Sequence, residues 1–161
     1  MRMLIAIYIS AMVAANLLVW WLGPWFAPLN AFILIGLDLT LRDVMHEHIT
    51  KWQMLGVVLT GGAITWVSNP SAQMIAIASA TAFTASAIAD WGVYSMLKGK
   101  SWMTRANGSN VVGAAVDSVI FPTLAFGVFM PWIILMQFIA KVVGGAIWAL
   151  VFRNRLVGMF P

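Results

Sequence analysis

The 161-residue sequence contains no cysteine and few charged residues. The absence of cysteine excludes disulfides, thiolate nucleophiles and cysteine metal ligands. Only 9% of the residues are charged, against about 25% in ordinary soluble domains. Hydrophobic residues make up 62% and the mean hydropathy is +0.93. A chain of this composition cannot cover itself with polar surface, so we expect a lipid bilayer to surround it.

The apolar residues form six stretches, most of them close to the ~20 residues that a helix needs to cross a bilayer. The connections between them are short and rich in Pro, Gly or charge, and none is long enough to separate two domains. The sequence therefore predicts one all-α integral membrane domain over residues 1–161. Its six transmembrane helices are expected near 3–22, from 29 into a polar turn at "LDLTLRD", 52–67, 72–97, 109–129 and 131–152.

Lysine and arginine collect at alternate connections, whereas "GPWFAPLN", "SNPS" and "FGVFMP" carry no charge. Because cytoplasmic loops hold the positive residues, both termini are expected to be cytoplasmic, in a bacterial inner membrane. This topology explains the net charge of +4 without a nucleic-acid partner. The expected partners are lipid and a small-molecule substrate, and a homodimer remains open. The charges at the positive ends belong to Arg2, Arg42, Lys51, Lys98, Lys100, Arg105, Arg153 and Arg155.

Four ionisable residues fall inside the predicted spans: Asp38, Asp90, Asp117 and Lys141. A charge at mid-membrane costs at least ~2.5 kcal/mol on insertion scales. These side chains should therefore face one another or a water-filled cavity. Asp90 and Asp38 are the candidate proton carriers, and Asp117 is expected beside Lys141.

Other polar and aromatic residues share helix faces with these four, as expected for a lined binding site. The plainer alternative is a buried ion pair with polar groups that hold helices together. The candidate substrate-binding residues are Asn16, Phe83, Ser86, Asp90, Asn110, Asp117, Phe121, Gln137 and Lys141.

The remaining motifs do not favour a metal site or an enzyme. In the connector segment His46-Glu47-His48, positions i and i+2 of a helix point apart and no third ligand has a recognisable spacing. Asp90 and Asp117 could form the acid pair of an intramembrane aspartyl protease, but Gly-x-Gly-Asp is absent. No P-loop is present, so this chain is not expected to hydrolyse ATP. Neither metal nor cofactor is expected.

The segment "SNVVGAAVDSVIFPTLAF" (109–126) resembles the signature of the queuosine-precursor transporter family, also described as a vitamin uptake transporter family. "FTASAIADWGVYSMLK" (83–98) and "QFIAKVVGGAI" (137–147) are similar to two further segments of that family, and "LDLTLRD" is a weaker likeness. The chain departs from the pattern at Ala87, where the family has an acid, and at Leu41-Arg42, where the family has a glutamate.

The resemblance implies uptake of 7-cyano-7-deazaguanine or 7-aminomethyl-7-deazaguanine, precursors of a modified tRNA base. Asp117 would accept the donor edge of the base, while Lys141, Gln137 or Asn110 would face its acceptors. Phe83, Phe121 or Trp91 would stack on the ring. The alternative is a substrate-binding subunit of an energy-coupling-factor importer, which docks through Ala-x-x-x-Ala on the first helix; Ala11 and Ala15 have that spacing. A purely structural membrane protein is the third reading.

Overall fold

The computed structural model describes residues 1–46 and 48–156, apart from the side chains of residues 43, 46, 51 and 153–156. Glu47, the centre of the His46-Glu47-His48 segment, lies outside the described residues, as does the tail 157–161.

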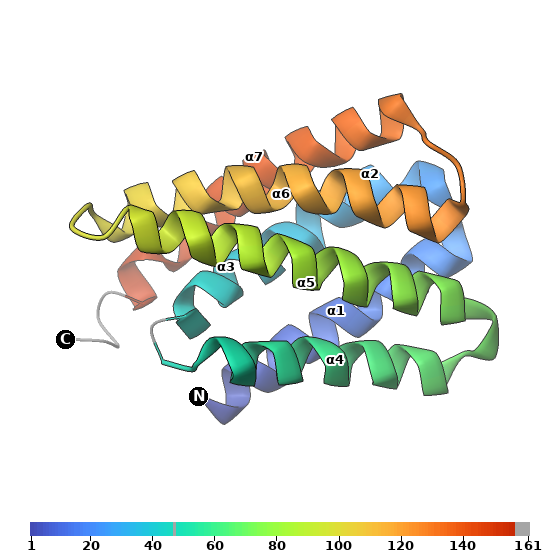
Figure 1. Cartoon of the computed structure of the whole chain (residues 1–161), viewed down its shortest axis with the longest axis horizontal. Helices are drawn as coiled ribbons and strands as arrows, with labels where there is room; N and C mark the ends of the chain where they lie inside the picture. Colours follow the sequence, from blue (N-terminus) through green and yellow to red (C-terminus); the bar gives the residue numbers. More distant parts are fainter. Residues whose placement is uncertain (47, 157–161) are drawn as a thin grey trace.

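The described chain consists of six helical rods that run alternately up and down (Figure 1). Every described element is a helix, which confirms the predicted all-α membrane class. α1 begins and α7 ends at the same end of the bundle, next to connectors 46–50 and 97–101, and we call this the charged end. The rods are α1 (Arg2–Leu22); η1 (Pro24–Phe26), α2 (Ala27–Asn30), η2 (Ala31–Ile35) and α3 (Gly36–His46) in series; α4 (Lys51–Ser68); η3 (Pro70–Ala72) with α5 (Gln73–Met96); α6 (Trp102–Phe126); and α7 (Pro131–Leu156).

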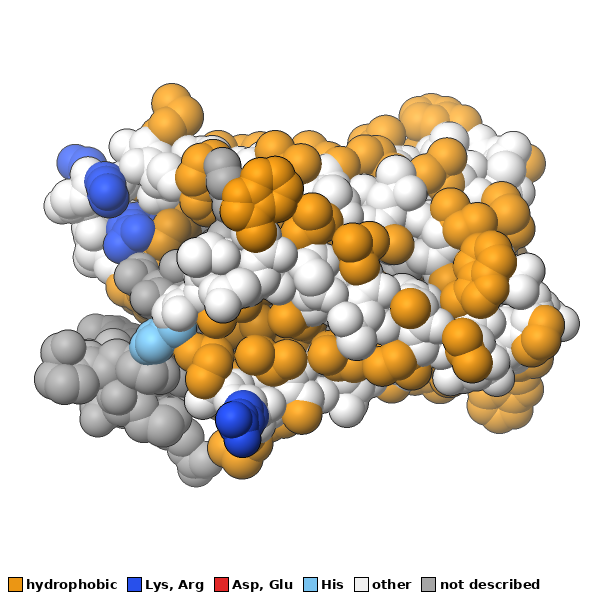
Figure 2. Space-filling view, turned by 60° about the horizontal axis from the view of Figure 1, so that its bottom comes forward, with side chains coloured by type: hydrophobic (Ala, Val, Ile, Leu, Met, Phe, Trp, Pro, Cys, Tyr) orange, Lys and Arg blue, Asp and Glu red, His pale blue; other side chains and the backbone are white. Residues whose placement is uncertain are grey.

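Among the described residues, five rods are long and apolar enough to cross a membrane. The remaining predicted span, 52–67, corresponds to α4. This 18-residue helix lies along α5 and also contacts α1. Figure 2 shows Lys and Arg side chains toward the charged end, while hydrophobic side chains extend over much of the same face.

Tryptophan marks both ends of the bundle, as in proteins whose aromatic belts lie at the lipid–water boundaries. Near the charged end lie Trp52, Trp91, Trp102 and Trp148; near the other end lie Trp20, Trp21, Trp25, Trp66 and Trp132.

The predicted turn at "LDLTLRD" is wrong, because residues 37–43 continue as helix in α3. No Gly or Pro interrupts this stretch, and its Thr40 and Arg42 side chains find hydrogen-bond partners inside the bundle. Arg42, expected in a cytoplasmic loop, is instead fully buried. Its guanidinium group donates to Ser86 Oγ on α5 at 3.2 Å.

The fifth rod also begins earlier than predicted, at Trp102 instead of residue 109. Ser101 caps this helix, since its hydroxyl accepts a hydrogen bond from the Thr104 backbone N–H at 3.3 Å. Asp117 consequently lies ~22 Å along α6 and only ~14 Å from its far end at Phe126, at about 1.5 Å per residue.

The second rod is discontinuous and is attached to α7 through closely packed backbone. Ala31–Ile35 forms one turn of π-helix, a feature often found at functional sites. A Cβ atom on Gly144 would collide with the Phe32 carbonyl, and one on Gly36 would lie 2.7 Å from the Gly144 carbonyl carbon. Thr40 Oγ1 also donates to the Gly145 carbonyl at 3.2 Å. Only glycine permits this approach, so the second rod and α7 form one packed pair.

Candidate substrate-binding site

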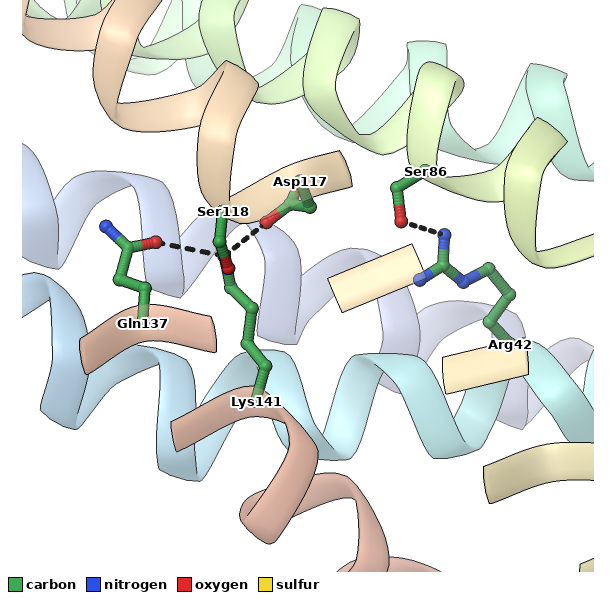
Figure 3. Close-up of polar contacts among 6 residues, drawn as sticks. All are labelled: Arg42, Ser86, Asp117, Ser118, Gln137 and Lys141. Carbon is green, nitrogen blue, oxygen red and sulfur yellow. Dashed lines mark hydrogen bonds and ion pairs between the residues drawn. The ribbon is translucent and has the colours of Figure 1, made fainter. Parts of the chain in front are cut away.

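Lys141 lies at the centre of the polar interior, in the middle of α7 and 1% exposed. Its ammonium group donates to Asp117 Oδ2 at 2.5 Å, Gln137 Oε1 at 2.9 Å and Ser118 Oγ at 3.1 Å. Figure 3 shows these acceptors converging on the end of the lysine side chain. All three ammonium donors are thus used, and the predicted approach of Asp117 to Lys141 is confirmed.

A small cavity adjoins this ion pair. Its volume is about 20 Å³, enough for about one water molecule and far below the ~300–1,000 Å³ of a typical ligand pocket. The cavity therefore has to widen before a bicyclic base can enter. Five of the six rods contribute its lining: Ala15, Asn16, Ala27, Asn30, Ala31, Ile35, Ser79, Phe83, Asp117, Phe121, Gln137 and Lys141.

Three polar atoms of the lining are buried without a hydrogen-bond partner in the described part of the chain. They are Asn30 Oδ1, Ser79 Oγ and Gln137 Nε2. The other ends of the two amides are engaged, since Asn30 Nδ2 donates to the Ala15 carbonyl at 3.2 Å and Gln137 Oε1 accepts from Lys141. Buried polar groups are normally satisfied. An acceptor, a donor and a hydroxyl are therefore available to a ligand in one small space.

A second polar cluster lies nearer the charged end. Arg42 reaches Ser86, and Asp90 follows Ser86 by four residues on the same face of α5. All three side chains are fully buried. Figure 3 shows the Arg42–Ser86 contact separated from the Lys141 cluster.

Asp38 is also fully buried on α3. Its carboxylate faces Tyr8 and interacts electrostatically with Arg42, Asp117 and Lys141. No hydrogen bond of regular geometry reaches either carboxylate oxygen within the described chain. Asp38 therefore lies within electrostatic reach of both polar clusters.

The structure thus divides the predicted site residues into two groups. Around the cavity it brings together Asn16, Phe83, Asp117, Phe121, Gln137 and Lys141. Ser86 and Asp90 belong to the second cluster, and Asn110 lies near Gly145, where its Nδ2 would be 3.7 Å from an added Cβ. Trp91 does not line the cavity. It lies with Trp52 in an apolar groove between α4 and α5, so it is not placed to stack on a ligand beside Lys141.

Sequence reasoning missed several polar residues of the interior, among them Asn30, Arg42 and Ser118. Asn30 was hidden in a connection rich in proline, and Arg42 fitted the cytoplasmic positive charges so well that burial was not considered. Ser118 follows Asp117 directly, and its contact with Lys141 required the rotation of α6 to be known. The sequence offered one usable signal for these residues, the Asn30 amide in an otherwise apolar segment.

Buried charges around a cavity in the interior of an apolar helical bundle that has a discontinuous helix are the arrangement of a membrane transporter. Residues 1–153 match the family model described as "Putative vitamin uptake transporter". The match covers nearly the whole chain, so the protein belongs to this family of multi-pass membrane transporters. No match was found among curated proteins or among solved structures.

Proposed function

We propose that this protein imports a 7-deazaguanine precursor of queuosine, such as 7-cyano-7-deazaguanine, across the bacterial inner membrane. Family membership supports uptake of a small molecule, and the motifs of residues 83–98, 109–126 and 137–147 support this particular substrate. In this proposal the chain is a carrier and catalyses no covalent reaction.

The observation that carries the proposal is the set of unpartnered polar atoms around the cavity. A guanine-like edge presents adjacent N–H and NH₂ donors beside a carbonyl acceptor. Asn30 Oδ1 and Asp117 accept from such donors, while Gln137 Nε2 donates to the carbonyl. Ser79 Oγ is available as either donor or acceptor.

The aromatic residues of the lining support a planar ligand. Phe83 and Phe121 come from neighbouring helices, α5 and α6, and both border the cavity. Stacking of a base on an aromatic ring is worth ~1–3 kcal/mol. A flat heterocycle between these rings would satisfy the polar atoms along its edge, which a flexible aliphatic vitamin would do less well.

The cavity volume of about 20 Å³ corresponds in this proposal to a closed conformation. Rocking of the α5–α6 pair against the pair formed by the second rod and α7 would widen it toward either side of the membrane. The Asp117–Lys141 ion pair joins these two pairs and would open as the substrate takes its place.

The test is uptake of labelled 7-cyano-7-deazaguanine by cells that lack endogenous carriers. We expect import by the wild type, competition by unlabelled 7-deazaguanines and little competition by adenine, which presents a different edge. Asp117→Asn should abolish import, whereas Lys98→Gln, an exposed change in connector 97–101, should not. Asp117→Asn protein that inserts normally and imports at the wild-type rate would contradict the assignment.

The energy-coupling-factor alternative requires an exposed face on which an ATP-driven module can dock. Its proposed docking residues, Ala11 and Ala15, are 8% and 1% exposed because they pack inside the chain. A docking face for an ATP-driven module would have to lie elsewhere. Import by this chain alone in a cell without such a module would separate the two hypotheses.

A further inference from the structure

Among the described side chains, the interior of the bundle holds more carboxyl groups than basic groups. Asp38, Asp90 and Asp117 are at most 5% exposed, and Arg42 and Lys141 at most 1%. They are the only buried Asp, Glu, Lys and Arg residues among the side chains described. With all five ionised, three negative and two positive charges leave one net negative charge. An uncompensated charge inside a membrane protein is costly, so one carboxyl group of the three is expected to hold a proton.

The contacts indicate which carboxyl group this is. Asp117 accepts a hydrogen bond from Lys141. Arg42 is directed toward the face of α5 that carries Ser86 and Asp90. Asp38 is fully buried, no hydrogen bond of regular geometry reaches either of its oxygens in the described chain, and the side chain that faces it is the neutral Tyr8 hydroxyl. The excess negative charge therefore falls on Asp38.

The titratable groups that act on Asp38 come from α1, α6, α7 and α3 itself. Tyr8 faces it from α1, Asp117 on α6 and Lys141 on α7 interact with it electrostatically, and Arg42 lies one turn along on α3. α4 and η2 also contact α3. η2 has no titratable residue, and α4 has only Lys51, at its first position.

We propose that Asp38 is the proton-binding residue that couples import to the proton gradient, with one proton carried per substrate. This inference rests on the proposed function. The Asp38 carboxylate takes up a proton from the outer side of the membrane, and the neutral carboxyl group releases that proton to the inner side. On release, the carboxylate gains Arg42, four residues along on the same helix face, as its ionic partner. Arg42 thereby alternates between the Ser86 face of α5 and Asp38.

The first test does not depend on the substrate. Infrared difference spectra of the reconstituted protein, recorded between acid and alkaline pH, report the carbonyl band of a protonated carboxyl group. We expect this band in the wild type and in Asp90→Asn, its loss in Asp38→Asn, and its return in Asp38→Glu. A band that persists in Asp38→Asn, or that only Asp90→Asn removes, overturns the inference. The Asp38→Asn side chain resembles the protonated acid, so this variant should insert into the membrane. If the variant does not insert, a wild-type spectrum without the carbonyl band still refutes the assignment of the proton to Asp38.

The second test measures coupling in proteoliposomes that contain a pH-sensitive dye and receive labelled 7-cyano-7-deazaguanine. The wild type should accumulate substrate under an inward proton gradient and acidify the lumen. Asp38→Asn should exchange internal for external substrate but neither accumulate it nor move protons. Wild-type import without proton movement overturns the role of Asp38 and leaves the proposed function standing. A wild type that neither imports nor exchanges this substrate overturns the proposed function and, with it, the coupling role.

Discussion

Replacing Lys141 by methionine tests the structure most directly, because this side chain connects four residues of the interior. The variant keeps most of the volume of the side chain but removes the charge that compensates Asp117. It also removes the donors to Ser118 and Gln137. The loss therefore combines an uncompensated buried carboxylate with two acceptors that no longer have a partner.

The expected magnitude follows from burial. Removing one partner of a buried ion pair costs about 3–5 kcal/mol, and Lys141 and Asp117 have side chains only 1% and 7% exposed. That cost corresponds to a change of about two to nearly four orders of magnitude in the unfolding equilibrium. Asp117→Asn should cost less, because Lys141 retains two of its three acceptors. The double variant Asp117→Asn/Lys141→Met should be more stable than Lys141→Met alone, since no unpaired charge remains.

The assay is a double-mutant cycle on purified protein in detergent, with reversible unfolding by a denaturing detergent followed through tryptophan fluorescence. Lys98→Met, at an exposed position, is the matched control and should unfold like the wild type. The double variant should regain stability without regaining uptake. If the free energies of unfolding of the two single variants simply add, the side chains do not interact, and the central contact of the site is refuted.

Three further predictions concern packing, binding and access. Gly144→Ala should destabilise the protein by about 1–3 kcal/mol through overpacking. Gly56→Ala, where a Cβ meets nothing within 4 Å, should instead add up to about 1 kcal/mol of helix stability, and thermal unfolding shows whether each variant is less or more stable than the wild type. Asn30→Ala should raise the KM for uptake roughly two- to tenfold, the worth of one hydrogen bond of about 0.5–1.5 kcal/mol, with little change in the maximal rate. A thiol placed at the cavity by Ser79→Cys should react slowly with a water-soluble maleimide in the absence of substrate and faster during substrate import. The control Ser71→Cys, at the exposed end of the bundle, should react quickly with or without substrate. Equal rates for the two cysteines would contradict a closed cavity.

The composition and the spacing of apolar runs were sufficient to predict the helical membrane class and the approximate limits of most rods. Those features depend on the bilayer, which acts on every residue in the same way and leaves a signal in the sequence. The pairing of Asp117 with Lys141 was predictable for the same reason, because charges deep in two spans require a partner. The limits of α6 were not, since its first seven residues are polar enough to resemble a connector.

The second rod shows why the rest was not predictable. Its course depends on a partner far away in the sequence, because Ser86, 44 residues later, accepts a hydrogen bond from the buried Arg42. The π-helical turn at Ala31–Ile35 packs against Gly144, whose missing Cβ allows the Phe32 backbone to touch α7. Local propensity carries no information on either contact, so the segment resembled a polar turn.

The same long-range contacts suggest why the site lies where it does. The second rod and α7 meet backbone to backbone at Gly36 and Gly144, and α5 and α6 pack closely at Gly113, where an added Cβ would lie 3.2 Å from Ser86 Oγ. Within each pair, separation would break close packing along the helices. Between the pairs, at the cavity, the joining contacts include polar side-chain bonds from Lys141 to Asp117 and Ser118. A ligand that offers its own donors and acceptors can replace polar bonds at little cost, whereas it cannot replace glycine packing. Motion is therefore expected at the ion pair, where a substrate is able to compensate for the contacts that are lost.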